Sequence, residues 1–303
     1  MNIQEHEPLG RYVAWRIGGP ARYFATARTA DELAELLRWG VERDLPIFVL
    51  GGGTNLLIGD AGFPGLAIRN RATTLHIEQH GDSAVLHADS GAPMAGTARR
   101  MAGQGLGGLI WAEGLPGTVG GAVYGNAGCY GGDLAGVLLD ATVVCPDGSV
   151  EQWDAERFHF AYRTSALKEQ ALSVAAADPG ATRMTYPIVL SARLRLQRDD
   201  PARLAAEMAT IAATRRSKTP SGSSCGSSFK NPPGTTAGKL LDEAGLKGTR
   251  VGGAVVSTVH ANYIVNDGGA TAEDVLRLTD IMRERVLQEC GVELELEVQL
   301  IGK

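Results

Sequence analysis

The feature that most constrains the fold of this chain is a run of three glycines, Gly51–Gly53, between two short apolar segments. Residues 46–50 (Pro-Ile-Phe-Val-Leu) precede the glycines, and Thr54 and Asn55 lead on into a second apolar run at 56–58. This pattern is typical of a strand that ends in a tight, irregular loop. Because glycine has no Cβ, successive backbone N–H groups in such a loop can approach one ligand closely. The loop therefore predicts a nest of donors for a diphosphate.

Composition restricts the class of protein. The chain has 303 residues, of which 44% are hydrophobic and 21% are charged, as expected for a globular protein with two or three domains. The net charge of −5 gives no reason to expect a nucleic acid or a membrane surface as partner. The N-terminus is polar and no window reaches about 18 apolar residues, so we expect a cytoplasmic protein. The four cysteines form no Cys-x-x-Cys pair, and we expect each histidine to be a surface or structural residue, so we expect no metal site.

The order of the expected elements favours mixed α+β layers over a uniform series of βαβ units. Thr29, followed by Glu32, is typical of the start of a helix, with Leu33 and the next two leucines on one face. The dipeptide at 147–148, Asp-Gly, indicates a hairpin turn. The other expected elements are strands at 84–89, 141–145, 254–257 and 262–265 and helices at 94–102, 201–216, 238–244 and 271–290.

Two further segments alternate apolar and polar residues, which predicts strands with one wet face. In the segment 188–196, the side chains expected to face water are those of Val189, Ser191, Arg193 and Arg195. In the segment 292–301, three glutamates at 293, 295 and 297 are expected to share one face of a final strand.

Two short motifs lack the surroundings that their usual functions require. Residues 103–108 contain Gly-x-Gly-x-x-Gly, but an expected helix precedes them where a Rossmann unit has a strand. Residues 222–226 contain Gly-x-Ser-x-Gly, but prolines flank them where a hydrolase elbow has a strand and a helix. Neither a Rossmann dinucleotide site nor a Ser-His-Asp hydrolase is therefore favoured.

Three other segments have both a functional and an ordinary interpretation. The small residues of 114–128 would let the backbone lie flat against a planar ligand, or they mark a tight crossing of strands. Arg163 follows the aromatic run 158–162 and would hold a carboxylate with two hydrogen bonds, or would form a surface ion pair. The irregular polar loop 225–234 is of the kind in which chemistry concentrates.

Taken together, these segments resemble the UDP-N-acetylenolpyruvoylglucosamine reductase (UDP-N-acetylmuramate dehydrogenase) family, from about Trp15 to Gly302. The motifs that carry the resemblance are Arg16-Ile17-Gly18-Gly19-Pro20-Ala21, Gly51-Gly52-Gly53-Thr54-Asn55, Leu115-Pro116-Gly117-Thr118-Val119-Gly120-Gly121, Asn126-Ala127-Gly128, Tyr162-Arg163-Thr164-Ser165, Arg216-Ser217-Lys218, Gly226-Ser227 with Phe229-Lys230, His260-Ala261-Asn262 and Glu297-Val298. The chain is similar to the shorter subtype, because it has no room between Leu194 and Pro201 for a tyrosine loop. It departs from the family pattern at Glu113 (usually small), Leu167 (usually Phe) and Gln299 (commonly Arg).

The resemblance implies an α+β fold in which two FAD-binding subdomains of the vanillyl-alcohol-oxidase/CO-dehydrogenase-flavoprotein type precede an α+β substrate domain. We expect FAD-binding subdomain 1 at 1–70, with the strand 297–303 returning to it, FAD-binding subdomain 2 at 71–200, and the substrate-binding domain at 201–296. FAD is expected to bind noncovalently, with its ring against the loop 115–128. The cofactor-binding residues implied are Gly51, Gly52, Gly53, Thr54, Asn55, Gly117, Thr118, Gly120, Gly121, Asn126 and Gly128.

The resemblance also implies a reaction. NADPH would reduce the flavin, and the enolpyruvyl group of UDP-N-acetyl-3-O-enolpyruvylglucosamine would then be reduced to give UDP-N-acetylmuramate for peptidoglycan synthesis. Ser227 matches the family's general acid, with Ser228 as its competitor on the bare sequence, and Arg163 and Glu297 match the pair at the substrate carboxylate. The substrate-binding residues implied are Tyr162, Lys218, Asn231, His260 and Asn262.

Two alternatives remain open from the sequence. One is an FAD-dependent oxidase of the same flavin-binding fold, and the other is a nucleotide-binding module without catalytic activity. The sequence further suggests a monomer with no nucleic-acid or membrane partner.

Overall fold

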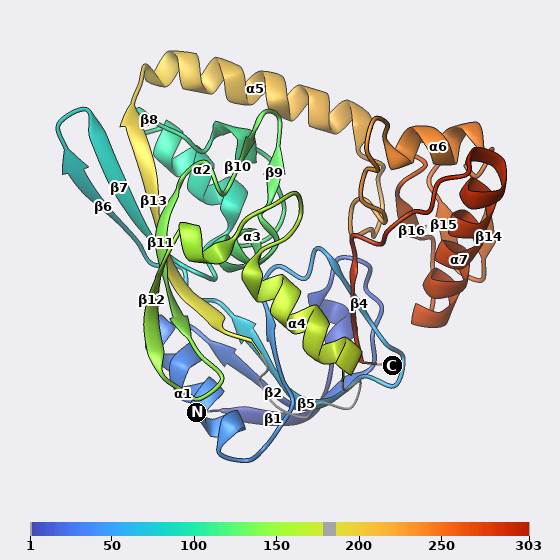
Figure 1. Cartoon of the computed structure of the whole chain (residues 1–303), viewed down its shortest axis with the longest axis horizontal. Helices are drawn as coiled ribbons and strands as arrows, with labels where there is room; N and C mark the ends of the chain where they lie inside the picture. Colours follow the sequence, from blue (N-terminus) through green and yellow to red (C-terminus); the bar gives the residue numbers. More distant parts are fainter. Residues whose placement is uncertain (1, 178–185, 303) are drawn as a thin grey trace. The chain divides into compact units, whose positions relative to one another are not determined.

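The computed structural model describes residues 2–177 and 186–302 and divides into two compact units (Figure 1). As far as these residues are described, unit 1 comprises Met1–Gln4, Tyr23–Gly52 and Gly65–Thr214, and unit 2 comprises Glu5–Arg22, Gly53–Pro64 and Arg215–Lys303. Four elements contribute residues to both units: β1 (Ile3–Pro8), β2 (Pro20–Ala27), β5 (Phe63–Asn70) and α5 (Pro201–Lys218). Among the described residues, no helix has both the length and the apolar composition needed to cross a membrane.

The larger sheet of unit 1 is antiparallel, with the strand order β12-β11-β13-β7-β6. Its strands lie side by side in Figure 1, and they are β6 (Leu75–His80), β7 (Ser83–Asp89), β11 (Leu138–Val144), β12 (Val150–Asp154) and β13 (Ile188–Arg198), with β8 (Leu106–Gly107) also paired to β13. The hairpin between β11 and β12 turns at the expected Asp147-Gly148, where Gly148 has φ +84° and donates its N–H to Cys145. Elsewhere in unit 1, β3 (Ile47–Leu50) pairs in parallel with β5.

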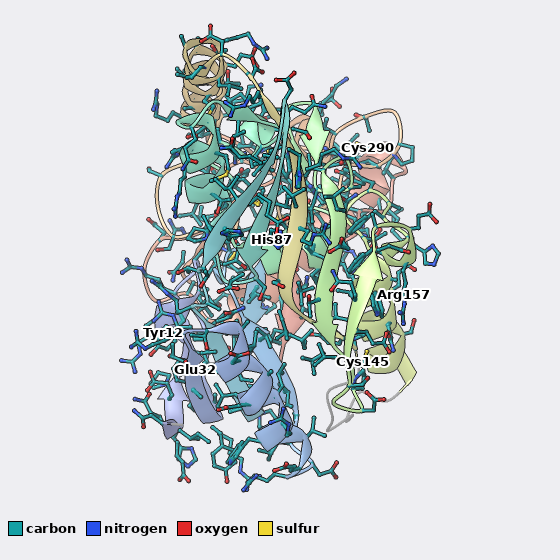
Figure 2. All side chains as sticks on the ribbon, turned by 90° about the vertical axis from the view of Figure 1, so that its left-hand side faces the viewer. Tyr12, Glu32, His87, Cys145, Arg157 and Cys290 are labelled. Atoms are coloured by element: carbon teal, nitrogen blue, oxygen red, sulfur yellow. The ribbon has the colours of Figure 1, made fainter. Side chains whose placement is uncertain are left out.

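The sequence predicted the first two of the following helices of unit 1 and did not predict the other two. They are α1 (Ala30–Val41), α2 (Met94–Ala102), α3 (Val119–Gly125) and α4 (Ala166–Ala177), with the 3₁₀ turns η2 (Ile110–Ala112) and η3 (Glu156–Phe158) and the short strands β9 (Gly128–Cys129) and β10 (Gly132–Asp133). As expected, Thr29 Oγ1 accepts the N–H of Glu32 at 3.1 Å, but the Glu32 carboxylate reaches back to the N–H of Arg28. Figure 2 labels Glu32 on α1 and His87 on β7. The three leucines of α1 that share a face, Leu33, Leu36 and Leu37, are buried.

One expectation for β13 is wrong. Val189 is buried, with 6% of its surface exposed, although the alternation placed it on the wet face. The start of β13 has an apolar cluster on each side: Val189 joins the larger core, whereas Ile188 and Leu190 join the core built on α1. Farther along the strand, Arg195 is exposed as expected. A strand covered on both faces loses the alternation that marks a half-buried strand.

Unit 2 is built around a third apolar cluster that contains Phe229 and Met282. Its elements are η1 (Leu9–Tyr12), β4 (Leu56–Ile58), α6 (Ala237–Glu243), β14 (Arg250–Val251), β15 (Ala254–Val256), β16 (Ile264–Asn266), α7 (Ala272–Cys290) and β17 (Gln299–Ile301). Helix α7 begins with a complete capping box between Thr271 and Asp274. The Asp60 carboxylate also accepts the N–H groups of Ala272 and Glu273, at 2.9 and 3.2 Å, where a negative charge stabilises a helix.

The expected final strand at 292–301 is also wrong over most of its length, because only β17 is a strand, and it runs parallel to β4. The preceding residues make isolated contacts with the segment 228–230. Phe229 and Leu296 form a single bridge, and the N–H of Lys230 donates to the carbonyl of Glu295 at 2.9 Å. An irregular partner segment of this kind does not support a continuous ladder.

Candidate functional site

Two glycine loops of unit 1 lie main chain against main chain. The first follows β3 at Gly51 and Gly52, and the second is the segment 114–118 before α3. A Cβ on Gly52 would lie 2.8 Å from the Cα of Gly117, and a Cβ on Gly51 would lie 2.6 Å from Oγ1 of Thr118. Gly117 also has φ +107°, in the region that favours glycine. The sequence separately predicted ligand-binding roles for both loops, and the structure brings them together.

Donors are available in these loops for an anionic ligand. In unit 1, no described acceptor takes the N–H of Gly52; in unit 2, taken by itself, the N–H groups of Gly53, Thr54 and Asn55 likewise have no described acceptor. Thr118 caps the start of α3, and Gly121 lies in the first turn of that helix with no atom closer to its ideal Cβ than 3.6 Å. The unpaired N–H of Gly52, which lies against Gly117 just before the start of α3, fits an anionic group such as a diphosphate. The residues present therefore fit the flavin dinucleotide expected from the sequence.

Two of the other glycines have a close neighbour within the protein. A Cβ on Gly120 would lie 2.8 Å from the Cβ of Ser90, and one on Gly128 would lie 2.6 Å from the Cβ of Asp133. Gly120 also donates its N–H to the Ser90 carbonyl at 2.8 Å. Tight packing explains these glycines without a ligand, so their expected cofactor contacts stay predictions. Gly53, in unit 2, has φ +62°, which favours glycine there.

Asn126 holds the loop after α3 in place. It has a left-handed backbone (φ 42°) and only 6% of its surface is exposed. Its amide donates to the Ala161 carbonyl at 3.0 Å and accepts the N–H of Ala135 at 3.1 Å. The side chain that the sequence assigned to the cofactor thus connects this loop to the segment just before Tyr162.

Arg163 is held in an uncommon backbone conformation. Its φ of +58° costs a non-glycine residue about 1–3 kcal/mol unless the surroundings fix it. Here Arg163 Nη1 donates to the Gly128 carbonyl at 2.9 Å, and buried Lys168 donates Nζ to the Arg163 carbonyl at 2.9 Å. The guanidinium lies 5.5 Å from the ring centroid of Tyr162, whose side chain is exposed. The sequence missed Lys168, since nothing local shows that its ammonium is buried.

Glu113, one of the three departures from the family pattern, has a partner in the structure. Its carboxylate is buried and accepts two hydrogen bonds from the guanidinium of Arg99 on α2, at 2.9 Å from Nε and 2.5 Å from Nη2. This bond raises the pKa of Arg99, because the carboxylate favours the charged guanidinium. This ion pair attaches Glu113, which immediately precedes the second glycine loop, to α2.

In unit 2, the segment 227–229 distinguishes the two competing serines. Ser228 is fully buried, its N–H donates to Asn262, its carbonyl accepts the N–H of Glu297, and its hydroxyl has no partner among the described residues. Ser227 instead forms an isolated bridge with Tyr263 and lines a cavity. The geometry therefore favours Ser227 as the serine that a ligand can reach.

That cavity has a volume of about 620 Å³ and lies within unit 2. It brings together four residues that the sequence singled out, Ser227, Asn231, His260 and Asn262. The sequence assigned no role to the remaining lining residues: Thr236, Gly238, Lys239, Asp242, Glu243, Lys247, Val259 and Ala261. Lys247 pairs with Asp242 at 2.7 Å and Lys239 with Glu243 at 3.8 Å, so both signs of charge border the cavity.

Asn55 and Glu297 are neighbours in unit 2. The Asn55 amide donates to the Glu297 carbonyl at 3.0 Å, and Gln299 donates its N–H to the Asn55 carbonyl at 3.1 Å. Thr54 is partly exposed, and Lys218 is exposed at the end of α5. Tyr162 and Arg163 belong to unit 1, whereas Ser227, Glu297 and the cavity belong to unit 2.

Replacing Asn262 with Ala is expected to lower the free energy of unfolding by roughly 2–5 kcal/mol, because two buried backbone groups lose their partners. The Asn262 amide accepts the N–H of Phe229 and donates to its carbonyl, both at 2.9 Å. Urea unfolding measures the change, with the exposed Asn2→Ala as control. A loss below about 0.5 kcal/mol, the usual range for surface changes, would contradict this structural role.

Comparisons with known proteins agree on one family. Residues 21–154 match the model described as FAD binding domain, and residues 217–301 match that of the UDP-N-acetylenolpyruvoylglucosamine reductase C-terminal domain. The UDP-N-acetylenolpyruvoylglucosamine reductase of Chloroflexus aggregans is 48% identical over 99% of this chain and 98% of its own length. That of Rubrobacter xylanophilus is 43% identical over 98% and 94%. The crystal structure of the Thermus caldophilus reductase superimposes with a TM-score of 0.79, at 34% identity, over 99% of this chain and 98% of that one.

Proposed function

The chain belongs to the UDP-N-acetylenolpyruvoylglucosamine reductase family, and on that basis we propose how its residues perform the reaction. The protein is an FAD-dependent oxidoreductase that uses NADPH to reduce the enolpyruvyl group of UDP-N-acetyl-3-O-enolpyruvylglucosamine, which gives UDP-N-acetylmuramate for peptidoglycan synthesis. The observation that carries the site assignment is the contact between the glycine loops at Gly52 and Gly117.

These loops bind the FAD diphosphate through their backbone N–H groups. Bound FAD supplies hydride transfer, from NADPH to the vinyl carbon of the substrate. The residues assigned to the cofactor are those of the two loops, together with Asn126, which acts through the position of its loop. On this assignment, residues 1–70 and 71–200 form the two FAD-binding subdomains and residues 201–296 bind the substrate.

Ser227 acts as the general acid. Hydride addition at C3 of the enolpyruvyl group leaves an electron pair at C2, and the Ser227 hydroxyl donates the proton that forms the C–H bond there. Positioned acid catalysis of this kind contributes about 10²–10⁴-fold. The support for this role is the place of Ser227 on the cavity wall, compared with the buried hydroxyl of Ser228.

Arg163 and Glu297 bind the substrate carboxylate, over which negative charge spreads as the carbanion forms. An arginine can hold a carboxylate with two parallel hydrogen bonds, and a donor placed at developing charge contributes about 3 kcal/mol. Glu297 helps only if it is protonated or if it orients another donor. Tyr162, Lys218, Asn231, His260 and Asn262 bind the rest of the UDP-sugar, and the protein acts as a monomer.

The absorbance of the purified chain tests this function directly. We expect a flavin band at about 450 nm that NADPH bleaches without oxygen and that the enolpyruvyl sugar restores. Air should restore the band far more slowly than the sugar does. Rapid reoxidation by oxygen with no response to the sugar would instead identify an oxidase, and a chain without the band would be no flavoenzyme.

A further inference from the structure

The first turn of α6 contains a glycine that the helix itself does not require. Gly238 is the second residue of the helix, follows the N-cap Thr236 closely, and has no positive φ. Alanine stabilises a helix more than glycine does. Another constraint must therefore explain the missing side chain.

The space beside Gly238 is occupied by the imidazole of His260. A Cβ at position 238 would lie 2.7 Å from Cε1 and 3.4 Å from Nδ1 of that ring. The ring also packs against Tyr263, with the two ring centroids 4.9 Å apart. His260 is thus seated between the helix backbone and an aromatic side chain, and it cannot move away freely.

The hydrogen bonds of His260 fix its tautomer. Nδ1 accepts the N–H of Asn262 at 3.2 Å, so this nitrogen has no proton of its own. A neutral ring then has its proton on Nε2. Burial and then the cation Lys247, with the smallest contribution from Lys218, lower the pKa of His260, and together they outweigh a backbone hydrogen bond and the carboxylate of Asp242, which raise it. His260 lines the cavity, and among the described residues no hydrogen bond engages its Nε2.

We propose that Gly238 is a positioning residue, whose missing side chain seats neutral His260 so that its Nε2–H donates a hydrogen bond to an oxygen of the UDP-sugar. This proposal rests on the proposed function and adds a position that the sequence did not assign. In this proposal Gly238 only positions the imidazole, and His260 is the residue that contacts the substrate.

A double-mutant cycle tests the proposal in the FAD-loaded enzyme. Losing one hydrogen bond corresponds to roughly a tenfold change in binding. We expect Gly238→Ala and His260→Ala each to raise the KM for UDP-N-acetyl-3-O-enolpyruvylglucosamine by about tenfold. Adding Gly238→Ala to His260→Ala should raise the KM no further, since the ring that the new Cβ would displace is absent.

Two controls make the result specific. Gly96→Ala in α2 is a matched change, because its nearest neighbour to a Cβ is 3.7 Å away, and it should leave the KM unchanged. His260→Gln, which keeps an N–H donor, should recover part of the affinity lost in His260→Ala. In the unaltered enzyme, the ¹⁵N signals of His260 should show a proton on Nε2, and Gly238→Ala should shift them.

Two results would overturn the proposal: an unchanged KM in Gly238→Ala, or effects of the two changes that simply add. Either could occur in an enzyme that still turns over the sugar normally, which would leave the proposed function intact. An unaltered protein that NADPH bleaches but that the sugar never reoxidises would instead remove the proposed function itself.

Discussion

Replacing Ser227 with Ala is expected to slow reoxidation of the reduced flavin by the enolpyruvyl sugar by about 10²–10⁴-fold. The variant loses the proposed proton donor, while the loops proposed to bind the flavin are untouched. Flavin reduction by NADPH should therefore proceed at the rate of the unaltered enzyme. Stopped-flow absorbance at about 450 nm separates the two half-reactions.

Ser228→Ala is the matched control for this experiment. Ser228 is the same residue type one position later, but it is fully buried and its hydroxyl has no partner among the described residues. Removing an unpaired buried hydroxyl should not destabilise the protein, and both half-reactions should keep their rates. If Ser228→Ala slows reoxidation and Ser227→Ala does not, the assignment of the acid is wrong. A Ser227→Ala variant impaired mainly in reduction by NADPH would also contradict it.

The sequence predicted well the features of the fold that depend on neighbouring residues, such as helix starts and turns. Thr29 and Thr271 begin α1 and α7 because a side-chain oxygen at the N-cap satisfies a backbone N–H that the helix leaves free. Asp147-Gly148 turns the hairpin because glycine tolerates the positive φ of that position. Each of these signals lies within a few residues, so no knowledge of the rest of the chain was needed.

The errors have non-local causes. The start of β13 is covered on both faces: Val189 packs in the larger core of unit 1, while a second cluster covers Ile188 and Leu190. That second cluster includes the leucines of α1, over 140 residues earlier in a chain of 303. The segment before β17 alternates like a strand, but its partner is the irregular segment 228–230. A period-two pattern shows which side chains are buried, and it does not show whether a regular partner strand exists.

The functional site was likewise predictable only in part from the sequence. The resemblance located Ser227 and His260, and the structure shows that both line one cavity. Gly238 could not be recognised from the sequence, because the histidine that explains it comes 22 positions later and meets it only in the folded unit. Lys168 and Arg99 were missed for the same reason: each becomes informative only through a partner that folding brings close.

Replacing Gly52 with Ala is expected to remove most of the bound FAD. The new Cβ would lie 2.8 Å from the Cα of Gly117, and backbone on both sides leaves no flexible side chain to move aside. Overpacking of this kind costs about 1–3 kcal/mol, which corresponds to roughly a tenfold to hundredfold loss of affinity if the loops separate. The ratio of flavin to protein absorbance after dialysis measures the loss. Added FAD should raise the Tm of the unaltered protein and have a much smaller effect on the variant.

Gly96→Ala again supplies the control, since this glycine lies in an exposed helical position with room for a methyl group. It should retain FAD fully and should stabilise α2 slightly. The comparison separates a general effect of losing a glycine from an effect of closing the space between the two loops. Because Gly52 and Gly117 lie against each other without room for a Cβ between them, Gly117→Ala should release FAD as well. If either variant keeps its full FAD content, the diphosphate is bound elsewhere and the contact between the loops is only structural.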